Sequence, residues 1–126
     1  MKNLFSLIIL GSLSLLLVSC GDDNIPPVIT INSPAPNSIL GLDSVLNLDV
    51  TVMDDTEVSS LTLVSETAAA GLDENFDLSS FADRTIIQIG VEINLETIPS
   101  GEYTFVLTAT DDQGESTSED INFTIQ

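Results

Sequence analysis

The sequence lacks histidine and tryptophan, and it contains one cysteine, one tyrosine and two basic residues. Without histidine there is no imidazole base and no histidine metal ligand. A serine or threonine nucleophile would need a basic partner, and the only base after Cys20 is Arg84. A carboxylate pair could in principle hydrolyse a glycoside, but few aromatic side chains remain to stack on a sugar ring. These absences predict that the protein is not an enzyme.

Positive charge is almost absent, whereas acidic residues are abundant. All 20 acidic residues and a single base, Arg84, follow Cys20, which gives residues 21–126 a formal net charge of −19. Nucleic-acid binding requires a basic surface, so a nucleic-acid partner is excluded. The same charge argues against docking of the domain on anionic lipid head groups. It favours a cation or a basic partner.

The lone cysteine ends the one long apolar run of the chain. Lys2 precedes the apolar residues 4–18, and the small residue Ser19 precedes Cys20. Because the run is shorter than the roughly 20 residues that span a bilayer, it predicts a cleaved signal peptide over residues 1–19. A single cysteine cannot form an intramolecular disulfide. The alternative is an ordinary secretory signal that ends in cysteine by chance.

The residues Leu17-Val18-Ser19-Cys20 resemble the lipobox of bacterial lipoproteins. The resemblance implies cleavage before Cys20, a thioether-linked diacylglycerol and an amide-linked acyl chain such as palmitate. Several acyl chains hold a protein stably on a membrane without a spanning segment.

The tether over residues 20–25 contains Gly21, Asp22, Asp23 and Asn24. It resembles the export signal of Bacteroidota lipoproteins, which implies a lipid anchor in the outer membrane and exposure at the cell surface. The alternative is a soluble linker that is acidic because the whole chain is acidic.

Apolar and polar residues alternate over most of residues 26–126, which indicates strands with one buried face. Alternating runs cover residues 45–53, 87–95, 103–110 and 121–125, and further strands are expected at 28–32 and 58–64. Turn-forming residues separate the runs at 54–56, 99–101 and 111–114. The segment 66–84 is expected to form a short helical turn, capped by Asp73 or Asp77, or an edge strand. One all-β domain of about seven antiparallel strands, arranged as a two-sheet sandwich, is the predicted fold.

Two segments carry a family resemblance. Ile98-Pro99-Ser100-Gly101-Glu102-Tyr103-Thr104-Phe105 resembles the entry to the penultimate strand of fibronectin type III and other immunoglobulin-like domains. Leu107-Thr108-Ala109-Thr110-Asp111-Asp112-Gln113-Gly114 is similar to the strand-and-turn ending of bacterial immunoglobulin-like and cadherin-like repeats. The resemblance implies an immunoglobulin-like sandwich in which Tyr103 forms a tyrosine corner, with its hydroxyl bonded to the chain just upstream. The alternative is a plain core aromatic.

An acidic cluster is expected at one pole of the sandwich. If strands 45–53 and 103–110 end at the same pole, that pole gathers five acids, with Glu115, Asp83 and the entry residues Asp22 and Asp23 expected nearby: Asp54, Asp55, Glu57, Asp111 and Asp112. Calcium takes six to eight oxygen ligands from such loops, and cadherin-like domains bind calcium through acidic loops. The sequence therefore predicts a calcium site, with two exposed acidic turns as the alternative.

These observations favour a non-catalytic binding module on the cell surface, with an unknown protein or glycan partner. One alternative is a calcium-stabilised adhesion or structural protein of the envelope. Another is an accessory lipoprotein of a nutrient (glycan) uptake system, although the shortage of exposed aromatics counts against direct sugar binding. Asp43-Ser44-Val45 also matches the short Bacteroidota O-glycosylation pattern.

Overall fold

The structure, a computed structural model, describes residues 25–67 and 75–126. The expected signal peptide, Cys20 and the residues Gly21, Asp22, Asp23 and Asn24 lie outside the described residues. Within the described ranges, no helix is long and apolar enough to cross a membrane.

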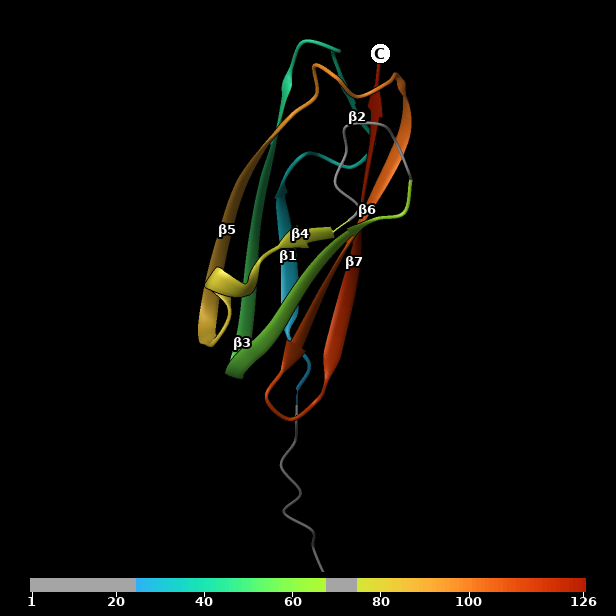
Figure 1. Cartoon of the computed structure of the whole chain (residues 1–126). Helices are drawn as coiled ribbons and strands as arrows, with labels where there is room; N and C mark the ends of the chain where they lie inside the picture. Colours follow the sequence, from blue (N-terminus) through green and yellow to red (C-terminus); the bar gives the residue numbers. More distant parts are fainter. Residues whose placement is uncertain (1–24, 68–74) are drawn as a thin grey trace, which may run out of the picture.

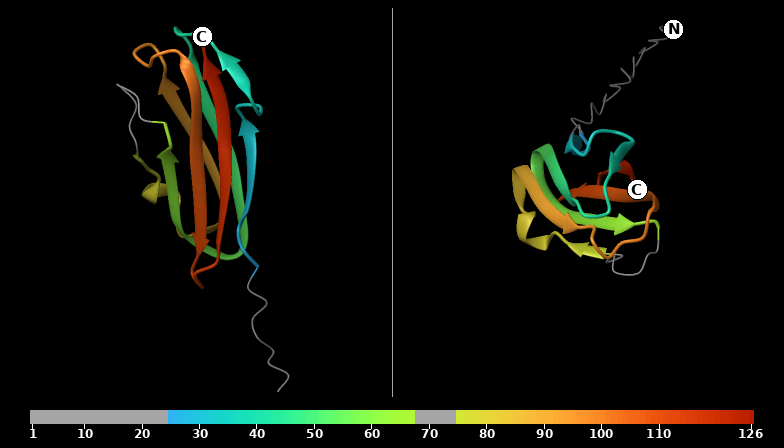
Figure 2. Two further views of the ribbon diagram at one scale, coloured as in Figure 1. Left: turned by 90° about the vertical axis from the view of Figure 1, so that its right-hand side faces the viewer. Right: turned by 90° about the horizontal axis from the view of Figure 1, so that it is seen from above.

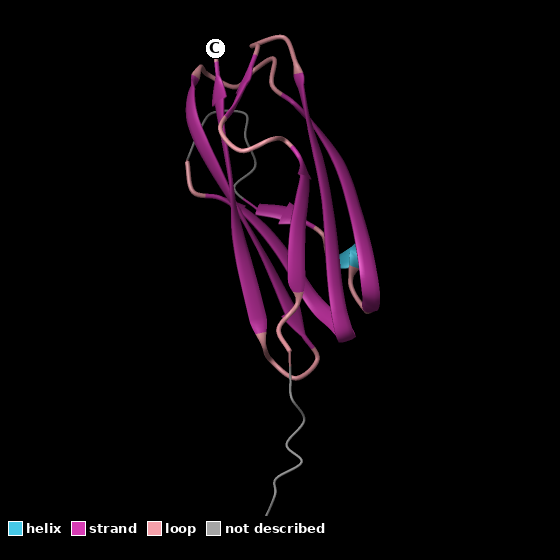
Figure 3. Cartoon of the chain, turned by 180° about the vertical axis from the view of Figure 1, so that it is seen from behind, coloured by secondary structure: helices cyan, strands magenta, loops and turns pink. Residues whose placement is uncertain are grey.

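The described chain forms seven strands and one short 3₁₀ helix (Figures 1 and 3). The elements are, in order, β1 (Val28–Ser33), β2 (Ser38–Leu40), β3 (Val45–Ser65), β4 (Asn75–Asp77), η1 (Ser79–Phe81), β5 (Arg84–Asn94), β6 (Gly101–Asp111) and β7 (Ser116–Ile125). The predicted all-β fold is confirmed.

The strands form two layers that share the long strand β3 (Figures 1 and 2). The first half of β3 pairs with β1 on one side and with β5 on the other. The second half pairs with β4 and β6, and β7 and β2 continue that layer. This is the arrangement of an immunoglobulin-like sandwich, and it leaves β1 and β7 at neighbouring edges of the two layers.

The expected turn at residues 54–56 is wrong in detail. Residues 45–53 and 58–64 were expected as separate strands, whereas β3 runs from Val45 to Ser65 and bends sharply (Figure 1). The pairing register breaks between Met53 and Val58. Val58 is fully buried and pairs with Arg84 of β5 and with Asp111 of β6. Because Val58 serves both layers, the chain passes between them with extended backbone rather than through a loop.

Two further details differ from or refine the expectation. The pairing of β2 with β7 is parallel, whereas the other pairs are antiparallel as expected. Both alternatives for residues 66–84 occur, because β4 pairs along β3 as a short strand and η1 follows it. Asp77 Oδ1 accepts the Ser79 N–H at 3.0 Å at the start of η1. The N-cap residue of η1 is nevertheless Leu78, so the expectation of an Asp77 cap is wrong and the Asp77 carboxylate instead stabilises the turn that leads into η1. Asp73, the other residue expected as a cap, lies outside the described residues.

The core lies between the two layers and is built from the alternating apolar residues. Phe105 is fully buried at its centre, with ring centroids 5.1 Å from Phe123 and 5.5 Å from Phe76. Phe76 and Phe81 are partly buried and pack against this core, so they support the fold. A buried side chain of this size stabilises a fold by about 1.5–3 kcal/mol, which lets the sandwich hold together without a disulfide.

Candidate functional site

The tyrosine predicted to form a corner lies at the start of β6. Its ring is buried and stacks on Phe123 with centroids 5.6 Å apart. Its hydroxyl donates a hydrogen bond to the carbonyl oxygen of Pro99 at 2.6 Å. Tyr103 therefore holds the β5–β6 connection against the core, and its role is structural.

The acidic residues predicted to cluster do meet at one pole. The Asp112 N–H donates to the Glu57 carbonyl at 3.0 Å, which joins the β6–β7 turn to the bend of β3. The Asp83 N–H donates to the Val58 carbonyl at 2.8 Å, which brings the residue before β5 to the same end of the molecule. We call this end of the molecule the acidic pole; its acidic residues are Asp54, Asp55, Glu57, Asp111 and Asp112.

Asp111 is the buried member of the acidic pole, with 1% of its surface exposed. Its Oδ1 accepts the N–H groups of Gln113 at 2.9 Å and Glu115 at 2.8 Å, so the carboxylate organises the β6–β7 turn. Its Oδ2 is buried and has no hydrogen-bond partner, as is also true of Asp54 Oδ2. Burial raises the pKa of the Asp54 carboxyl, and the neighbouring Asp55 side chain and the negative charge of Asp111 raise it further.

The structure gives the predicted calcium site no support. Within residues 25–67 and 75–126, no group of three or more acidic side chains is placed so that it could hold a metal ion. The geometry explains why, since Asp111 uses one oxygen for its own turn while Asp55, Glu57 and Asp112 are exposed. The acidic pole thus agrees with the alternative hypothesis, in which the acidic residues belong to turns that aspartate side chains stabilise by hydrogen bonds.

An exposed apolar row, which the sequence reading missed, crosses the outer face of the first layer beside the acidic pole. Val28, Met53 and Ile86 lie opposite one another on β1, β3 and β5, and each is at least half exposed. A shallow cleft of about 280 Å³ lies at one end of this row, lined in part by Ile25 and Pro26. Strand alternation places each of these residues on an outer face, but only the register brings them together.

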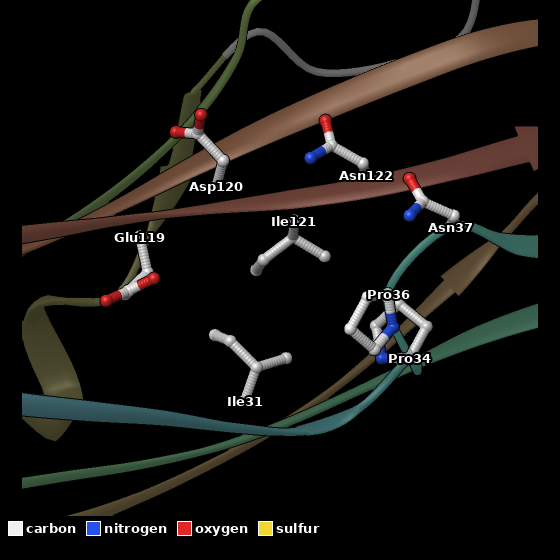
Figure 4. A pocket seen from close by; sticks show the side chains of 8 residues that line it. All are labelled: Ile31, Pro34, Pro36, Asn37, Glu119, Asp120, Ile121 and Asn122. Atoms are coloured by element: carbon white, nitrogen blue, oxygen red, sulfur yellow. The ribbon is translucent and has the colours of Figure 1, made fainter.

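A second concave feature, the β1–β7 groove, lies between the edges of the two layers (Figure 4). It has a volume of about 180 Å³ and is lined by Ile31, Pro34, Pro36, Asn37, Glu119, Asp120, Ile121 and Asn122. Ile31 and Ile121 point toward each other across it, and Glu119 lies on the same face of β7 as Ile121 (Figure 4). No motif in the sequence indicates this groove, because its walls come from β1 and β7, which are the first and last strands along the chain.

Two solved structures share the fold at low sequence identity. A fibronectin(III)-like module of Clostridium thermocellum CbhA matches with a TM-score of 0.54 and 17% identity, covering 78% of this chain and 94% of that one. A Niemann-Pick type C2 protein from the Japanese carpenter ant matches with a TM-score of 0.52 and 13% identity, covering 82% of this chain and 95% of that one. At these identities the likeness establishes the sandwich fold and nothing about activity.

A comparison with curated proteins gave no match. A family model covers residues 18–126, which includes the whole of the chain that follows the apolar run. The chain therefore belongs to the family described as Domain of unknown function (DUF4625).

Proposed function

We propose that this protein is a lipid-anchored, non-catalytic module that binds a basic partner at the bacterial cell surface. The charge distribution carries the proposal, because Cys20 separates an apolar segment with one base from a domain with 20 acids and one base. A domain with this charge attracts cationic partners and speeds their association.

The anchor half of the proposal rests on the position of Cys20. The cysteine lies eight residues before Val28, where β1 begins. The intervening chain is polar up to Asn24, so it would act as a short tether between the membrane and the sandwich. Palmitate on Cys20 and location on the outer face of the outer membrane are parts of the same proposal.

Labelled-palmitate incorporation tests the anchor. The wild-type chain should take up label and sediment with membranes, whereas Cys20→Ala should do neither. Label or membrane association that persists in Cys20→Ala would contradict the anchor. A protease added to intact cells should degrade the wild-type domain, and full protection there would contradict surface exposure.

Cross-linking on intact cells tests the binding half. A basic partner should give a discrete adduct with the wild-type domain, and high salt should abolish the adduct because salt screens exposed charges. The absence of any adduct at low salt, or an adduct that is insensitive to salt, would contradict a charge-driven partnership.

A further inference from the structure

The β1–β7 groove borders an open strand edge. β6 pairs with β7 along its length, whereas on the other side β2 pairs only with Phe123–Ile125. The Asn122 carbonyl accepts the Asn37 N–H at 3.1 Å just before that pairing begins. Because hydrogen-bonding direction alternates along a strand, the N–H and C=O groups of Asp120 and Ser118 point to the same side. In the described part of the chain, no strand pairs with β7 there.

Such an edge can accept an additional strand. Extended peptides bind open sheet edges through main-chain hydrogen bonds, and adjacent pockets for alternate side chains supply the specificity. The β1–β7 groove is a concave feature next to this edge, and it includes Asp120. Its volume of about 180 Å³ is below the roughly 300–1,000 Å³ of sites for drug-sized ligands. The groove is thus of a size for one side chain rather than for a whole small molecule.

The lining of the groove specifies which side chain fits. Ile31 and Ile121 supply apolar walls, while the charged lining residues, Glu119 and Asp120, are both acidic (Figure 4). Arg84 is the only base after Cys20 and lies on β5, which is separated from β1 by β3. The positive charge that would complement the groove therefore has to come from another molecule. Lysine and arginine combine an apolar stem with a charged head, which matches apolar walls that end at a carboxylate.

We infer that the β1–β7 groove and the free edge of β7 bind an extended peptide segment that carries a lysine or arginine. The peptide adds as a strand beside Ser118 and Asp120, and its basic side chain lies between Ile31 and Ile121 with its charge at Glu119. The inference deepens the proposed function by naming the chemistry of the partner and the surface that receives it.

Peptide titration against the purified chain in detergent tests this inference. The probe is a short peptide of alternating threonine and valine with one central lysine, flanked by serines and labelled for fluorescence anisotropy. The comparison peptides carry norleucine or glutamate at the central position. We expect the lysine peptide to bind more tightly than the norleucine peptide, and the glutamate peptide to bind most weakly. Equal binding of the lysine and norleucine peptides would overturn the inference.

Protein variants locate the site. An exposed ion pair contributes up to about 1 kcal/mol, so Glu119→Gln should weaken binding of the lysine peptide by roughly two- to fivefold. Glu96→Gln is the matched control, because Glu96 is exposed in the turn that follows β5. Equal losses of peptide affinity in both variants would show that only the overall negative charge attracts the peptide, and would overturn the assignment of the binding site to the groove.

Methylation of the peptide backbone tests the strand pairing. N-methyl groups on one alternate set of amides should abolish binding, whereas methylation of the other set should be tolerated, because only one set faces β7. Equal tolerance of both patterns would overturn the strand addition. None of these measurements depends on the lipid. A negative peptide titration would therefore not contradict the lipid anchor on Cys20, and a negative palmitate experiment would not contradict peptide binding at the groove.

Discussion

The hydroxyl of Tyr103 donates a hydrogen bond to the carbonyl oxygen of Pro99 at 2.6 Å. The bond closes the connection between β5 and β6, and the ring below it stacks on Phe123. Tyr103 thus fastens the connection that enters β6 to the core of the layer formed by β6 and β7.

Removal of this hydroxyl should weaken the fold moderately. Tyr103→Phe keeps the ring and loses one hydrogen bond, so the free energy of unfolding should fall by about 0.5–1.5 kcal/mol. Phe105→Ala should cost more, about 3–5 kcal/mol, because it leaves a cavity in the centre of the core. Urea unfolding followed by circular dichroism measures both values. A Tyr103→Phe variant as stable as wild type would show that the corner bond adds nothing.

Asp111, the buried last residue of β6, should matter to stability because its carboxylate organises the turn that follows. Asp111→Ala leaves the N–H groups of Gln113 and Glu115 without their acceptor, and we expect a loss of about 1–3 kcal/mol. Asp112→Ala is the control, because the Asp112 side chain is exposed and a surface change of this kind stays within about 0.5 kcal/mol. Thermal unfolding of the two variants compares them directly. Similar losses would contradict the structural role of Asp111.

Asp54 and Asp77 should respond to pH with opposite signs. The pKa of Asp54 is raised in the folded state, chiefly by burial, so its ionisation weakens the fold as pH rises above the ordinary value of 3.8. The pKa of Asp77 is lowered by hydrogen bonds from the Ser79 hydroxyl and N–H. Its contribution is present above pH 3.8 and is lost as pH falls through the lowered pKa.

The two asparagine variants separate these effects. At neutral pH, Asp54→Asn should raise the melting temperature and Asp77→Asn should lower it. The gain in Asp54→Asn should shrink as the pH falls toward 3.8 and should vanish well below that pH, where the wild-type carboxyl is protonated in both the folded and the unfolded state. Melting curves over a pH series measure this trend. A lower melting temperature for Asp54→Asn at neutral pH would mean that its carboxylate stabilises the fold.

Much of the sandwich is predictable because alternation reports directly on strands with one buried face. The bend in β3 is harder to predict from the sequence, because Asp54-Asp55-Thr56 consists of residues that favour turns whether the chain forms a loop there or stays extended. What decides the matter is the burial of Val58 between two layers, which only the assembled fold reveals.

The acidic pole and the β1–β7 groove differ in the same way. The gathering of Asp54 and Asp111 at one pole follows from strand direction, but the sequence does not reveal whether their oxygens converge on an ion or are used by turns. The groove depends on which strand edges become neighbours, so Ile31 and Ile121 carry no sign of it in the sequence. The turn and strand preferences of short segments are predictable from the sequence. The contacts between residues that are far apart in the chain become known only from the structure.

Mass spectrometry of the N-terminal peptide from the membrane fraction tests the central claim most directly. If the protein is a lipid-anchored module, the mature chain begins at Cys20 and carries the mass of a diacylglycerol on sulfur and an acyl chain on nitrogen. A mature chain that begins at another residue, or a Cys20 without added mass, would contradict the account.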